Sequence, residues 1–434
     1  MKIRINGENV IGKIKPMNAV NIPPVGGYGE KIDSKFHYLK EIGTPYARLH
    51  DIGLLYGNCQ YVDIPHIFKN FDADVNDPAS YDFTFTDELL KSLVKNGIEP
   101  YYRLGVSIEN NAEIKNYFLD PPKDYEKWAS ICEHIVAHYN DGWADGYHMN
   151  ITYWEIWNEP DDGMRQSHMW NGTPEDYYRL YEVTSKKLKK RFPNIKVGGY
   201  ASISLELGYL EIDKNRPDYK ALEYYLDFFH GFWKYVKEHN CPIDFYSWHT
   251  YAPSDSAVAQ ADYIHKCLVE YGYGDVEIHL NEWNPHKDRR GTAKHGAEVA
   301  AMMLRMQNKS FMNMLIVYHA SPRGTYSAFF DCNTLLPTFH AYYVFAAFNK
   351  LYALENQVEL SIDEKGVYAV AAVKDGKGAL LVTNVSGNEQ SLELDGVSLE
   401  DARWYVIDSK RLLSWAPECH KIENNTVILV EFNV

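Results

Sequence analysis

The stretch Tyr153-Trp154-Glu155-Ile156-Trp157-Asn158-Glu159-Pro160 decides the fold, because it is an apolar, aromatic strand that ends on a carboxylate. Aromatic and β-branched residues favour a strand. Pro160 has no backbone N–H to give to a neighbouring strand, so the strand ends there. Glu159 can therefore leave the sheet and face a cleft. We predict that the rest of the chain is a scaffold that holds Glu159 opposite a second glutamate.

Short β-like runs alternate with amphipathic helical runs along the chain, a pattern typical of βα units. The predicted strands are Asn18–Ile22, Tyr46–His50, Glu99–Gly105, Thr152–Trp157, Lys196–Tyr200, Asp244–His249, Glu277–Asn281 and Met314–His319. The predicted helices are Glu30–Ile42, Asp87–Asn96, Asp124–Tyr139, Pro174–Phe192, Leu222–Asn240, Ser256–Tyr271, Thr292–Gln307 and Pro337–Leu351. Eight strands and eight helices thus alternate strictly.

Several of these boundaries carry physical signals of their own. Asn96-Gly97 is typical of a helix end, and Thr173-Pro174-Glu175-Asp176 begins a helix with a cap, a proline and first-turn acids. Strands such as Ile243–His249 lack clean alternation, as in a parallel sheet that is covered on both faces. We therefore predict an α/β fold, a (β/α)8 TIM barrel over residues 16–351. The alternative is a doubly wound open sheet, but no glycine-rich phosphate loop follows the first strand.

Beyond residue 352 the pattern changes to short alternating runs with hairpin turns. Asp375-Gly376-Lys377-Gly378 and Ser386-Gly387-Asn388 are typical hairpin connections. We predict an accessory antiparallel β-sandwich domain made of residues 352–434 and residues 1–15. The amino-terminal runs Lys2–Ile5 and Val10–Lys15 have no role in a barrel and are expected to pair with this domain. No site chemistry is evident in it, so we expect a structural role.

The charge and hydropathy of the chain exclude several kinds of partner. The 434 residues carry a net charge of −15, from 44 basic and 59 acidic side chains. Such an acidic chain is not expected to bind nucleic acid or an anionic membrane as its main partner. No run approaches the ~18 apolar residues of a membrane span, and the amino-terminal MKIRINGENVIGKIKP lacks the apolar core of a signal peptide. We expect a cytoplasmic protein.

Cysteines and aromatic residues give weaker information. The six cysteines show no CxxC spacing, so neither a zinc knuckle nor a disulfide framework is predicted, and reduced core residues are expected: Cys59, Cys132, Cys241, Cys267, Cys332 and Cys419. The 34 tyrosines and 10 tryptophans are an excess. Flat amphipathic rings are what sugar-binding clefts use against pyranoses, although aromatic residues also fill large cores.

The carboxyl ends of the strands form the active site in a barrel of this kind. Two glutamates there follow an asparagine, in Trp157-Asn158-Glu159-Pro160 and in Asn281-Glu282-Trp283-Asn284. They end the fourth and seventh predicted strands, which lie on opposite sides of the ring. Glycoside hydrolysis requires such a pair, with a separation of ~5–5.5 Å for retention of configuration and ~6.5–9.5 Å for inversion.

Three blocks, Trp154–Asp161, Tyr246–Tyr251 and Glu282–Asn284, together resemble glycoside hydrolase family 39. That family of retaining glycosidases contains β-xylosidases and α-L-iduronidases, and it pairs the barrel with a β-sandwich. The resemblance implies that Glu159 is the general acid/base and Glu282 the nucleophile that forms a glycosyl-enzyme intermediate. It also implies that Asn158 hydrogen-bonds the 2-hydroxyl of the sugar.

The remaining candidate site residues are assigned by their places at the strand ends. The acid needs a raised pKa and the nucleophile a low one. Arg48 and Tyr251 are placed to hydrogen-bond Glu282 and keep it ionised, and Glu155 is expected to be a buried structural partner of Arg48. Four further residues are candidates for sugar binding, by hydrogen bonding or by stacking: His50, His249, His319 and Trp283.

The sequence after the eighth strand departs from the xylosidases of the family, which carry acidic residues there for the outer hydroxyls of the glycone. This chain has Tyr318-His319-Ala320-Ser321-Pro322-Arg323 instead, with Asp331 only later. Arg323 could meet the carboxylate of a uronic acid. An arabinoside, a glucoside or galactoside, and a uronide therefore stay open beside a β-xyloside.

Two other classes of protein are alternatives. His50, His249 and His319 at strand ends would permit a metal-dependent barrel hydrolase, but the first strand ends at Asn21-Ile22-Pro23-Pro24 without an HxH pair. A carbohydrate-binding protein without catalysis would not need both carboxylates. We predict a retaining, exo-acting glycosidase, β-xylosidase-like, that takes an oligosaccharide or glycoside and requires no cofactor or metal. The sequence predicts no oligomeric state.

Overall fold

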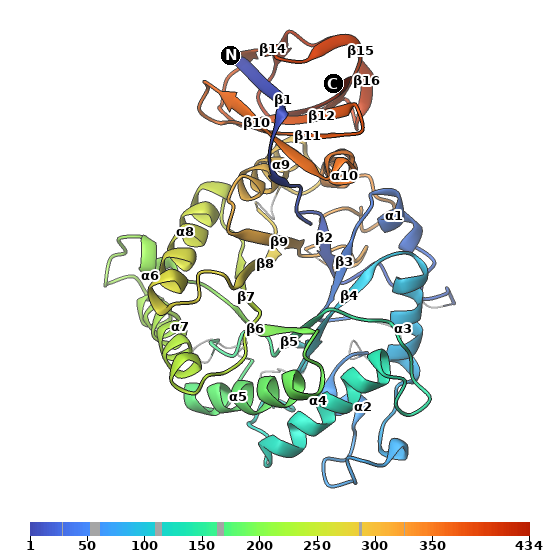
Figure 1. The fold of residues 1–434 in the computed structure, drawn as a ribbon, viewed down its shortest axis with the longest axis vertical. Coiled ribbons are helices and arrows are strands. Elements are labelled where there is room, and N and C mark those ends of the chain that lie inside the picture. Colours follow the sequence, from blue (N-terminus) through green and yellow to red (C-terminus); the bar gives the residue numbers. More distant parts are fainter. Residues whose placement is uncertain (28, 53–60, 109–114, 163–168, 286–288, 325) are drawn as a thin grey trace.

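A computed structural model describes residues 1–27, 29–52, 61–108, 115–162, 169–285, 289–324 and 326–434. Its larger part is a closed barrel of eight strands with helices outside it (Figure 1). All neighbouring strands of the barrel are parallel. In ring order the strands are β2 (Ala19–Asn21), β3 (Tyr46–Leu49), β4 (Glu99–Leu104), β5 (Tyr153–Ile156), β6 (Lys196–Ser202), β7 (Phe245–Thr250), β8 (Glu277–Trp283) and β9 (Met312–Val317). The predicted (β/α)8 barrel is confirmed.

The helices also follow the predicted pattern. They are α1 (Phe36–Glu41), α2 (Ile64–Ile67), α3 (Thr84–Lys95), α4 (Tyr125–Asn140), α5 (Pro174–Arg191), α6 (Glu206–Tyr209), α7 (Tyr219–Glu238), α8 (Ser254–Tyr271), α9 (Ala293–Gln307) and α10 (His340–Leu354), with a 3-10 helix at Pro78–Ser80. Thr173 caps α5 as predicted and forms a capping box with Asp176, and Gly97 follows α3 with a left-handed φ of 76°. The short α2 and α6 were not predicted, because four residues cannot display a helical period.

The smaller part is one eight-stranded sheet in the order β14-β1-β10-β11-β12-β18-β15-β16, with β13 and β17 paired beside it. Its strands are β1 (Lys2–Lys13), β10 (Asn356–Ile362), β11 (Val367–Lys374), β12 (Lys377–Asn384), β13 (Gln390–Ser391), β14 (Glu393–Asp395), β15 (Ser398–Ile407), β16 (Ser414–Ala416), β17 (Lys421–Ile422) and β18 (Thr426–Asn433). As predicted, the amino-terminal strand joins this part, by antiparallel pairing of β1 with β10. Its other neighbour, β14, is parallel, so the sheet is mixed instead of wholly antiparallel. No short turn connects β1 with β14, so nothing local imposes the antiparallel direction.

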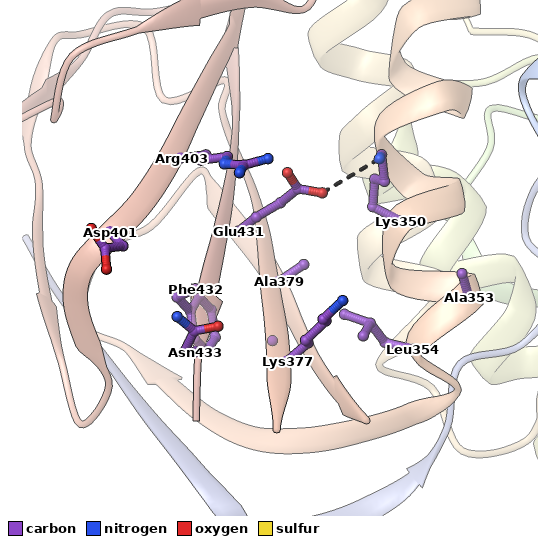
Figure 2. A pocket seen from close by; sticks show the side chains of 11 residues that line it. Lys350, Ala353, Leu354, Lys377, Ala379, Asp401, Arg403, Glu431, Phe432 and Asn433 are labelled. Atoms are coloured by element: carbon purple, nitrogen blue, oxygen red, sulfur yellow. Dashed lines mark ion pairs between the residues drawn. The ribbon is translucent and has the colours of Figure 1, made fainter. Parts of the chain in front are cut away.

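The sheet is attached to the last two helices of the barrel. α9 and α10 pack on one of its faces, where Leu381 and Leu429 join the core of the barrel. A pocket of about 420 Å³ lies at this junction, where α10 meets β12, β15 and β18. Figure 2 shows the side chains that line it. Lys350 of α10 and Glu431 of β18 form an ion pair of 3.4 Å across it. The last barrel helix therefore holds the sheet by both apolar and ionic contacts.

Five cysteines are free thiols, as expected for a reduced protein, and Cys59 lies outside the described residues. Cys132, Cys241 and Cys267 are buried, but the expectation of core positions is wrong for Cys332, which is exposed, and for the partly exposed Cys419. Both of these lie in irregular segments between elements, where few side chains cover them. Among the described residues, no helix is both long enough and apolar enough to cross a membrane.

The amino-terminal end of the barrel contains a partly buried ionic cluster around Glu277, the first residue of β8. Glu277 accepts hydrogen bonds from the Tyr153 hydroxyl at 3.2 Å and from His279 Nε2 at 3.2 Å, and it pairs with Lys196. Burial raises the pKa of Glu277, but the hydrogen bonds and charges of His279 and Lys196 outweigh it and lower the pKa to about 2. The ionised carboxylate therefore stabilises the fold.

We expect Glu277→Gln to lower the free energy of unfolding at neutral pH by about 1–3 kcal/mol, the usual cost of leaving buried partners unsatisfied. The folded-state pKa lies below the ordinary 4.5, so this stability is present above that pH and is lost as the pH falls through about 2. Urea unfolding at a series of pH values measures it. A difference between wild type and variant that does not shrink on acidification would contradict the assignment.

Candidate active site

The turn after β5 directs Glu159 into the mouth of the barrel. Trp157 and Glu159 have left-handed φ angles of 73° and 47°, a conformation that costs ~1–2 kcal/mol for a residue with a Cβ. The turn is held by two sets of backbone hydrogen bonds: Trp157 N–H donates to Leu104 O at 2.7 Å, and Glu159 N–H donates to the carbonyls of Tyr200 and Ala201, both at 3.2 Å. The neighbouring strands on both sides therefore impose the strained turn.

An irregularity in β8 places Glu282 on the inner side of the barrel. Trp248 of β7 lies opposite Leu280, but the next residue, His249, lies opposite Glu282, so Asn281 is an extra residue in the register. In a regular strand Asn281 and Glu282 would point to opposite faces. A bulge removes this restriction and can re-aim a side chain at a functional site. The side chains of both residues consequently contact groups inside the barrel.

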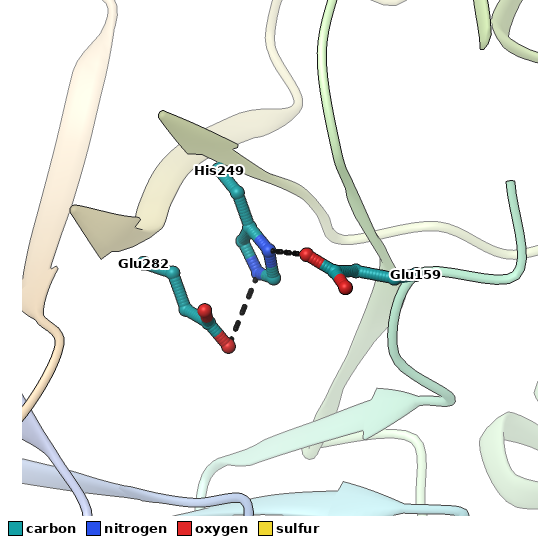
Figure 3. A group of neighbouring side chains, drawn as sticks. All are labelled: Glu159, His249 and Glu282. Carbon is teal, nitrogen blue, oxygen red and sulfur yellow. Dashed lines mark hydrogen bonds and ion pairs between the residues drawn. The ribbon is translucent and has the colours of Figure 1, made fainter. Parts of the chain in front are cut away.

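Glu159 and Glu282 face each other across His249, as Figure 3 shows. His249 Nδ1 lies 2.7 Å from Glu159 Oε1, and Nε2 lies 3.7 Å from Glu282 Oε1, too far for a hydrogen bond. One oxygen of each carboxylate and one ring nitrogen all lie within 4.8 Å of one another. Burial lowers the pKa of His249 to about 4, so the ring is neutral near pH 7. The two predicted catalytic glutamates are thus brought together.

Arg48 connects the residues around Glu282. Its Nη1 donates to Glu282 Oε1 at 2.9 Å and to Asn21 Oδ1 at 3.2 Å, and its Nη2 donates to Asn158 Oδ1 at 2.6 Å. On its other side Nε donates to Glu155 Oε2 at 2.7 Å, which confirms the predicted buried pair. Because Asn158 Oδ1 faces Arg48, its amide nitrogen is turned away from the guanidinium and can donate elsewhere.

The environment of Glu282 corrects one expectation. The predicted hydrogen bonds from Arg48 and from the Tyr251 hydroxyl, at 2.9 Å each, are present. Nevertheless the pKa of Glu282 is raised above 4.5, because burial, with the nearby Glu159, outweighs the lowering by His249, Arg48 and Tyr251. The sequence-based expectation of a low pKa is therefore wrong for the free protein. Only 5% of Glu282 is exposed, and this burial could not be inferred from the strand-end motif.

His50 is bound on both ring nitrogens by the protein itself. Arg103 Nε donates to Nδ1 at 3.2 Å, so the proton of the neutral ring lies on Nε2, 3.1 Å from Asp51 Oδ1. Asp51 Oδ2 in turn accepts from the Tyr318 hydroxyl at 3.1 Å. Sequence reasoning missed Asp51, although it directly follows His50 at a strand end. A sugar hydroxyl that reached His50 would have to compete with Asp51 or Arg103.

The other candidate sugar ligands differ in accessibility. Tyr251 is 38% exposed, so its ring reaches the opening of the site while its hydroxyl contacts Glu282. His319 is almost buried, and its Nδ1 has no hydrogen-bond partner among the described residues. Burial, with Arg290 nearby, lowers the pKa of His319 to about 3. Trp283 is fully buried in the barrel core, which leaves no ring face for stacking on a sugar in this conformation.

Arg323 and Asp331 belong to the segment after the eighth strand, where the sequence departs from the xylosidases of the family, and they lie in different surroundings. Arg323 is exposed, and a Cβ placed on Gly27 would lie only 2.5 Å from Arg323 Nη2, so the guanidinium covers the loop after β2. Asp331 accepts hydrogen bonds from the backbone of Asn333 and from the backbone and hydroxyl of Thr334. Asp331 therefore closes a surface turn.

The same group of side chains could in principle hold a metal ion. The potential ligand atoms of Glu159, His249 and Glu282 have suitable spacing. Of the three histidines of the predicted alternative, only His249 belongs to this group in the described part of the chain, and His50 and His319 do not. The Arg48 guanidinium lies 2.9 Å from Glu282 and would repel a second cation. The arrangement therefore favours proton transfer and nucleophilic attack by carboxylates.

Comparison with known proteins shows the family of this chain. The sequence model described as Glycosyl hydrolases family 39 matches residues 31–355. The chain belongs to glycosyl hydrolase family 39. The resemblance seen in the three sequence blocks is thereby confirmed, and the matched region contains both catalytic candidates.

Individual relatives of this family 39 protein are distant. A β-xylosidase of Geobacillus stearothermophilus is 26% identical over 246 residues, 55% of this chain and 41% of the relative. A β-xylosidase of Caldicellulosiruptor saccharolyticus is 26% identical over 308 residues, 65% of this chain and 56% of the relative. The matches thus span about half of these curated relatives. The crystal structure of a glucosidase from Croceicoccus marinus has a TM-score of 0.76 at 19% identity, covering 100% of this chain and 99% of that one, which shows a shared fold.

Proposed function

We propose that this family 39 protein is a retaining glycoside hydrolase, exo-acting and β-xylosidase-like. The observation that carries the proposal is the pair Glu159 and Glu282, with carboxylate oxygens within 4.8 Å of one another. Retaining enzymes hold the two carboxyl groups ~5–5.5 Å apart, whereas inverting enzymes need ~6.5–9.5 Å to admit a water between sugar and base. The observed spacing supports double displacement.

In the proposed reaction, Glu159 gives its proton to the glycosidic oxygen while Glu282 attacks the anomeric carbon. The leaving alcohol departs with that proton, and a glycosyl ester of Glu282 forms. Glu159, now ionised, then removes a proton from a water that attacks the same carbon and releases Glu282. Two inversions at one carbon restore the original configuration.

The surrounding side chains have distinct proposed roles. Arg48 and Tyr251 hold the two oxygens of Glu282, which aims the carboxylate at the anomeric carbon. Asn158, oriented by Arg48, can donate from its amide nitrogen to the 2-hydroxyl. His249 is neutral, hydrogen-bonds Glu159 and adds no charge that would compete with the acid proton. His319 is proposed to bind a glycone hydroxyl, and His50 is proposed to bind one only by exchanging its contact with Asp51 for that hydroxyl.

A panel of 4-nitrophenyl glycosides tests the activity and the glycone. The relatives named β-xylosidase favour the β-xyloside as the best substrate, against the arabinoside, glucoside, galactoside and glucuronide. Proton NMR of the first-formed sugar should show the anomeric configuration of the substrate. An inverted product would contradict double displacement, and turnover of none of the glycosides would contradict the proposed activity. Release of single sugars from xylotriose, without xylobiose as a first product of internal cleavage, tests exo action.

We expect Glu159→Ala to lower kcat/KM for glycosides with a poor leaving group by about 10²–10⁴-fold, the usual contribution of a general acid. Substrates with a dinitrophenol leaving group need no protonation, so their glycosylation step should be nearly unaffected. Comparing the two substrates in steady state measures this difference. Equal losses for both, or turnover equal to wild type, would contradict the role of Glu159 as the general acid.

A uronide is the second candidate glycone, and one observation favours it. Arg290 stacks over the Tyr326 ring at 5.2 Å and acts electrostatically on His319, so a cation lies beside the eighth-strand end of the site. An arginine at such a place can pair with a sugar carboxylate. In the panel, a glucuronide hydrolysed faster than the xyloside would establish this alternative.

A further inference from the structure

Glu155 is a third carboxylate beneath the catalytic pair, and the proposed reaction does not use it directly. It is fully buried in β5, and its Oε2 accepts from Arg48 Nε at 2.7 Å. Its other oxygen, Oε1, accepts from Ser247 Oγ and from Asn281 Nδ2, both at 2.6 Å. Three strands besides its own therefore supply donors that fix this carboxylate in one orientation.

Arg48 is consequently shared by two buried carboxylates. Glu155 binds one side of the guanidinium, and Glu282 binds Nη1 at 2.9 Å. Arg48 is fully buried and Glu282 nearly so, so water screens these charges little. Arg48 carries one positive charge against two negative charges, which leaves an uncompensated negative charge beside the reaction centre.

The other groups that face this trio do not supply the missing positive charge. Tyr101, on β4 next to Arg48, and Tyr251, which donates to Glu282, are neutral hydroxyls whose pKa values burial raises above the usual range. His249 is neutral near pH 7, since burial lowers its pKa to about 4. Glu159 on the far side of the mouth can only add negative charge. The extent to which the negative charge of Glu282 is neutralised therefore depends on how strongly Arg48 interacts with Glu155.

We infer that Glu155 is a positioning residue for the reaction: by binding the opposite side of Arg48 it draws part of that cation away from Glu282 and keeps Glu282 a strong nucleophile. The inference rests on the proposed glycosidase function. A carboxylate neutralised by an arginine of its own would be less basic and would attack the anomeric carbon more slowly. Arg48 orients Glu282, and Glu155 limits how far Arg48 neutralises it.

Glu155→Gln tests this inference with little change in shape. The Asn281 Oδ1 has no hydrogen-bond partner among the described residues, so rotation of that amide would let it accept from the new NH₂ group. Arg48 would then act on Glu282 alone. We expect the acid limb of the pH profile of kcat/KM to move to lower pH by about one pH unit, because a nearby opposite charge lowers a carboxyl pKa by ~1–3 and Arg48 would act on Glu282 alone. We expect kcat to fall about tenfold, because a less basic carboxylate is a weaker nucleophile. An acid limb that stays in place or moves to higher pH would overturn the inference.

Two further variants separate this effect from a loss of structure. Ser247→Ala removes a hydrogen-bond donor to Glu155, so the Glu155 carboxylate should interact more strongly with Arg48. Arg48 would then neutralise Glu282 less, and the acid limb should move slightly to higher pH, opposite to its shift in Glu155→Gln. If Glu155→Gln does not fold, Ser247→Ala tests the inference by itself. An acid limb that moves to lower pH, or does not move, in this variant would then overturn the inference. Glu277→Gln changes a partly buried, ion-paired glutamate on the same strand as Glu282; it is the matched control and should leave the limb unchanged.

The ionisation of Glu282 can also be measured directly, without an activity assay. In protein labelled with ¹³C at the glutamate side-chain carboxyl, the Glu282 resonance is assigned by its loss in Glu282→Gln, and its titration should move to lower pH in Glu155→Gln. If wild type hydrolyses no glycoside, the proposed function fails while this titration still tests Glu155. If wild type is active but neither the limb nor the titration moves, the inference alone fails.

Discussion

Glu282→Gly should lower kcat for every glycoside by on the order of 10⁵-fold or more, as expected when the nucleophile of a covalent mechanism is removed. No other described carboxylate takes its place, since Glu159 is held by His249 and Glu155 lies beneath Arg48. Added azide fits the space of the missing side chain and should restore turnover. Its single displacement gives a glycosyl azide with the anomeric configuration opposite to that of the substrate.

The matched control for this experiment is Glu159→Ala with azide. There Glu282 still forms the glycosyl-enzyme, and azide replaces the water of the second step, so the glycosyl azide should retain the configuration of the substrate. NMR of the two azide products distinguishes the roles of the two glutamates. Products of reversed stereochemistry would mean that acid/base and nucleophile are exchanged, and rescue of neither variant would contradict the double displacement.

Arg48→Met should have the largest effect on stability, with a loss of about 3–5 kcal/mol in the free energy of unfolding, the usual cost of breaking a buried ion pair. The variant leaves Glu155 and Glu282 buried without a counter-charge. The pKa of Glu282, already raised by burial, should rise further. The acid limb of kcat/KM should then move to higher pH by more than one pH unit. Urea unfolding and the pH profile measure the two effects.

The double variant Arg48→Met/Glu155→Gln is the control. It removes one of the two uncompensated charges, so it should regain part of the stability lost in Arg48→Met, with a clear non-additivity in the double-mutant cycle. Its acid limb should lie between those of the single variants. Additive losses of stability would mean that Arg48 and Glu155 do not interact as their distance of 2.7 Å indicates.

Much of the fold follows from local patterns in the sequence. The eight barrel strands lie within a few residues of their predicted ranges. The signals that predicted them, apolar runs without alternation, prolines and helix caps, are each contained in a short stretch of sequence. Thr173 marks the start of a helix and Gly97 the end of another, and both signals act locally, independently of the tertiary structure. The elements without such signals were missed, among them α2 and α6 and the short strands β16 and β17.

The candidate site was predicted in part for a similar reason. Glu159 and Glu282 end the fourth and seventh barrel strands, so counting strands was enough to place them across the ring. Glu155 was also predicted to be the buried partner of Arg48, and its place four residues before Glu159 in an alternating strand explains why both lie on the inner side. These predictions needed only the periodicity of a strand and the symmetry of a closed barrel.

Three features of the site were decided by the tertiary structure alone. The irregularity at Asn281 turns Glu282 inward, and the contacts of His50 with Arg103 and Asp51 occupy a ring expected to bind sugar. Burial also raises the pKa of Glu282, for which the sequence predicted a low value. By itself, the sequence of this family 39 protein determined which residues end each strand, because that depends on neighbours along the chain. Register, burial and charge sharing depend on distances between strands far apart in sequence, and only the folded barrel sets those distances.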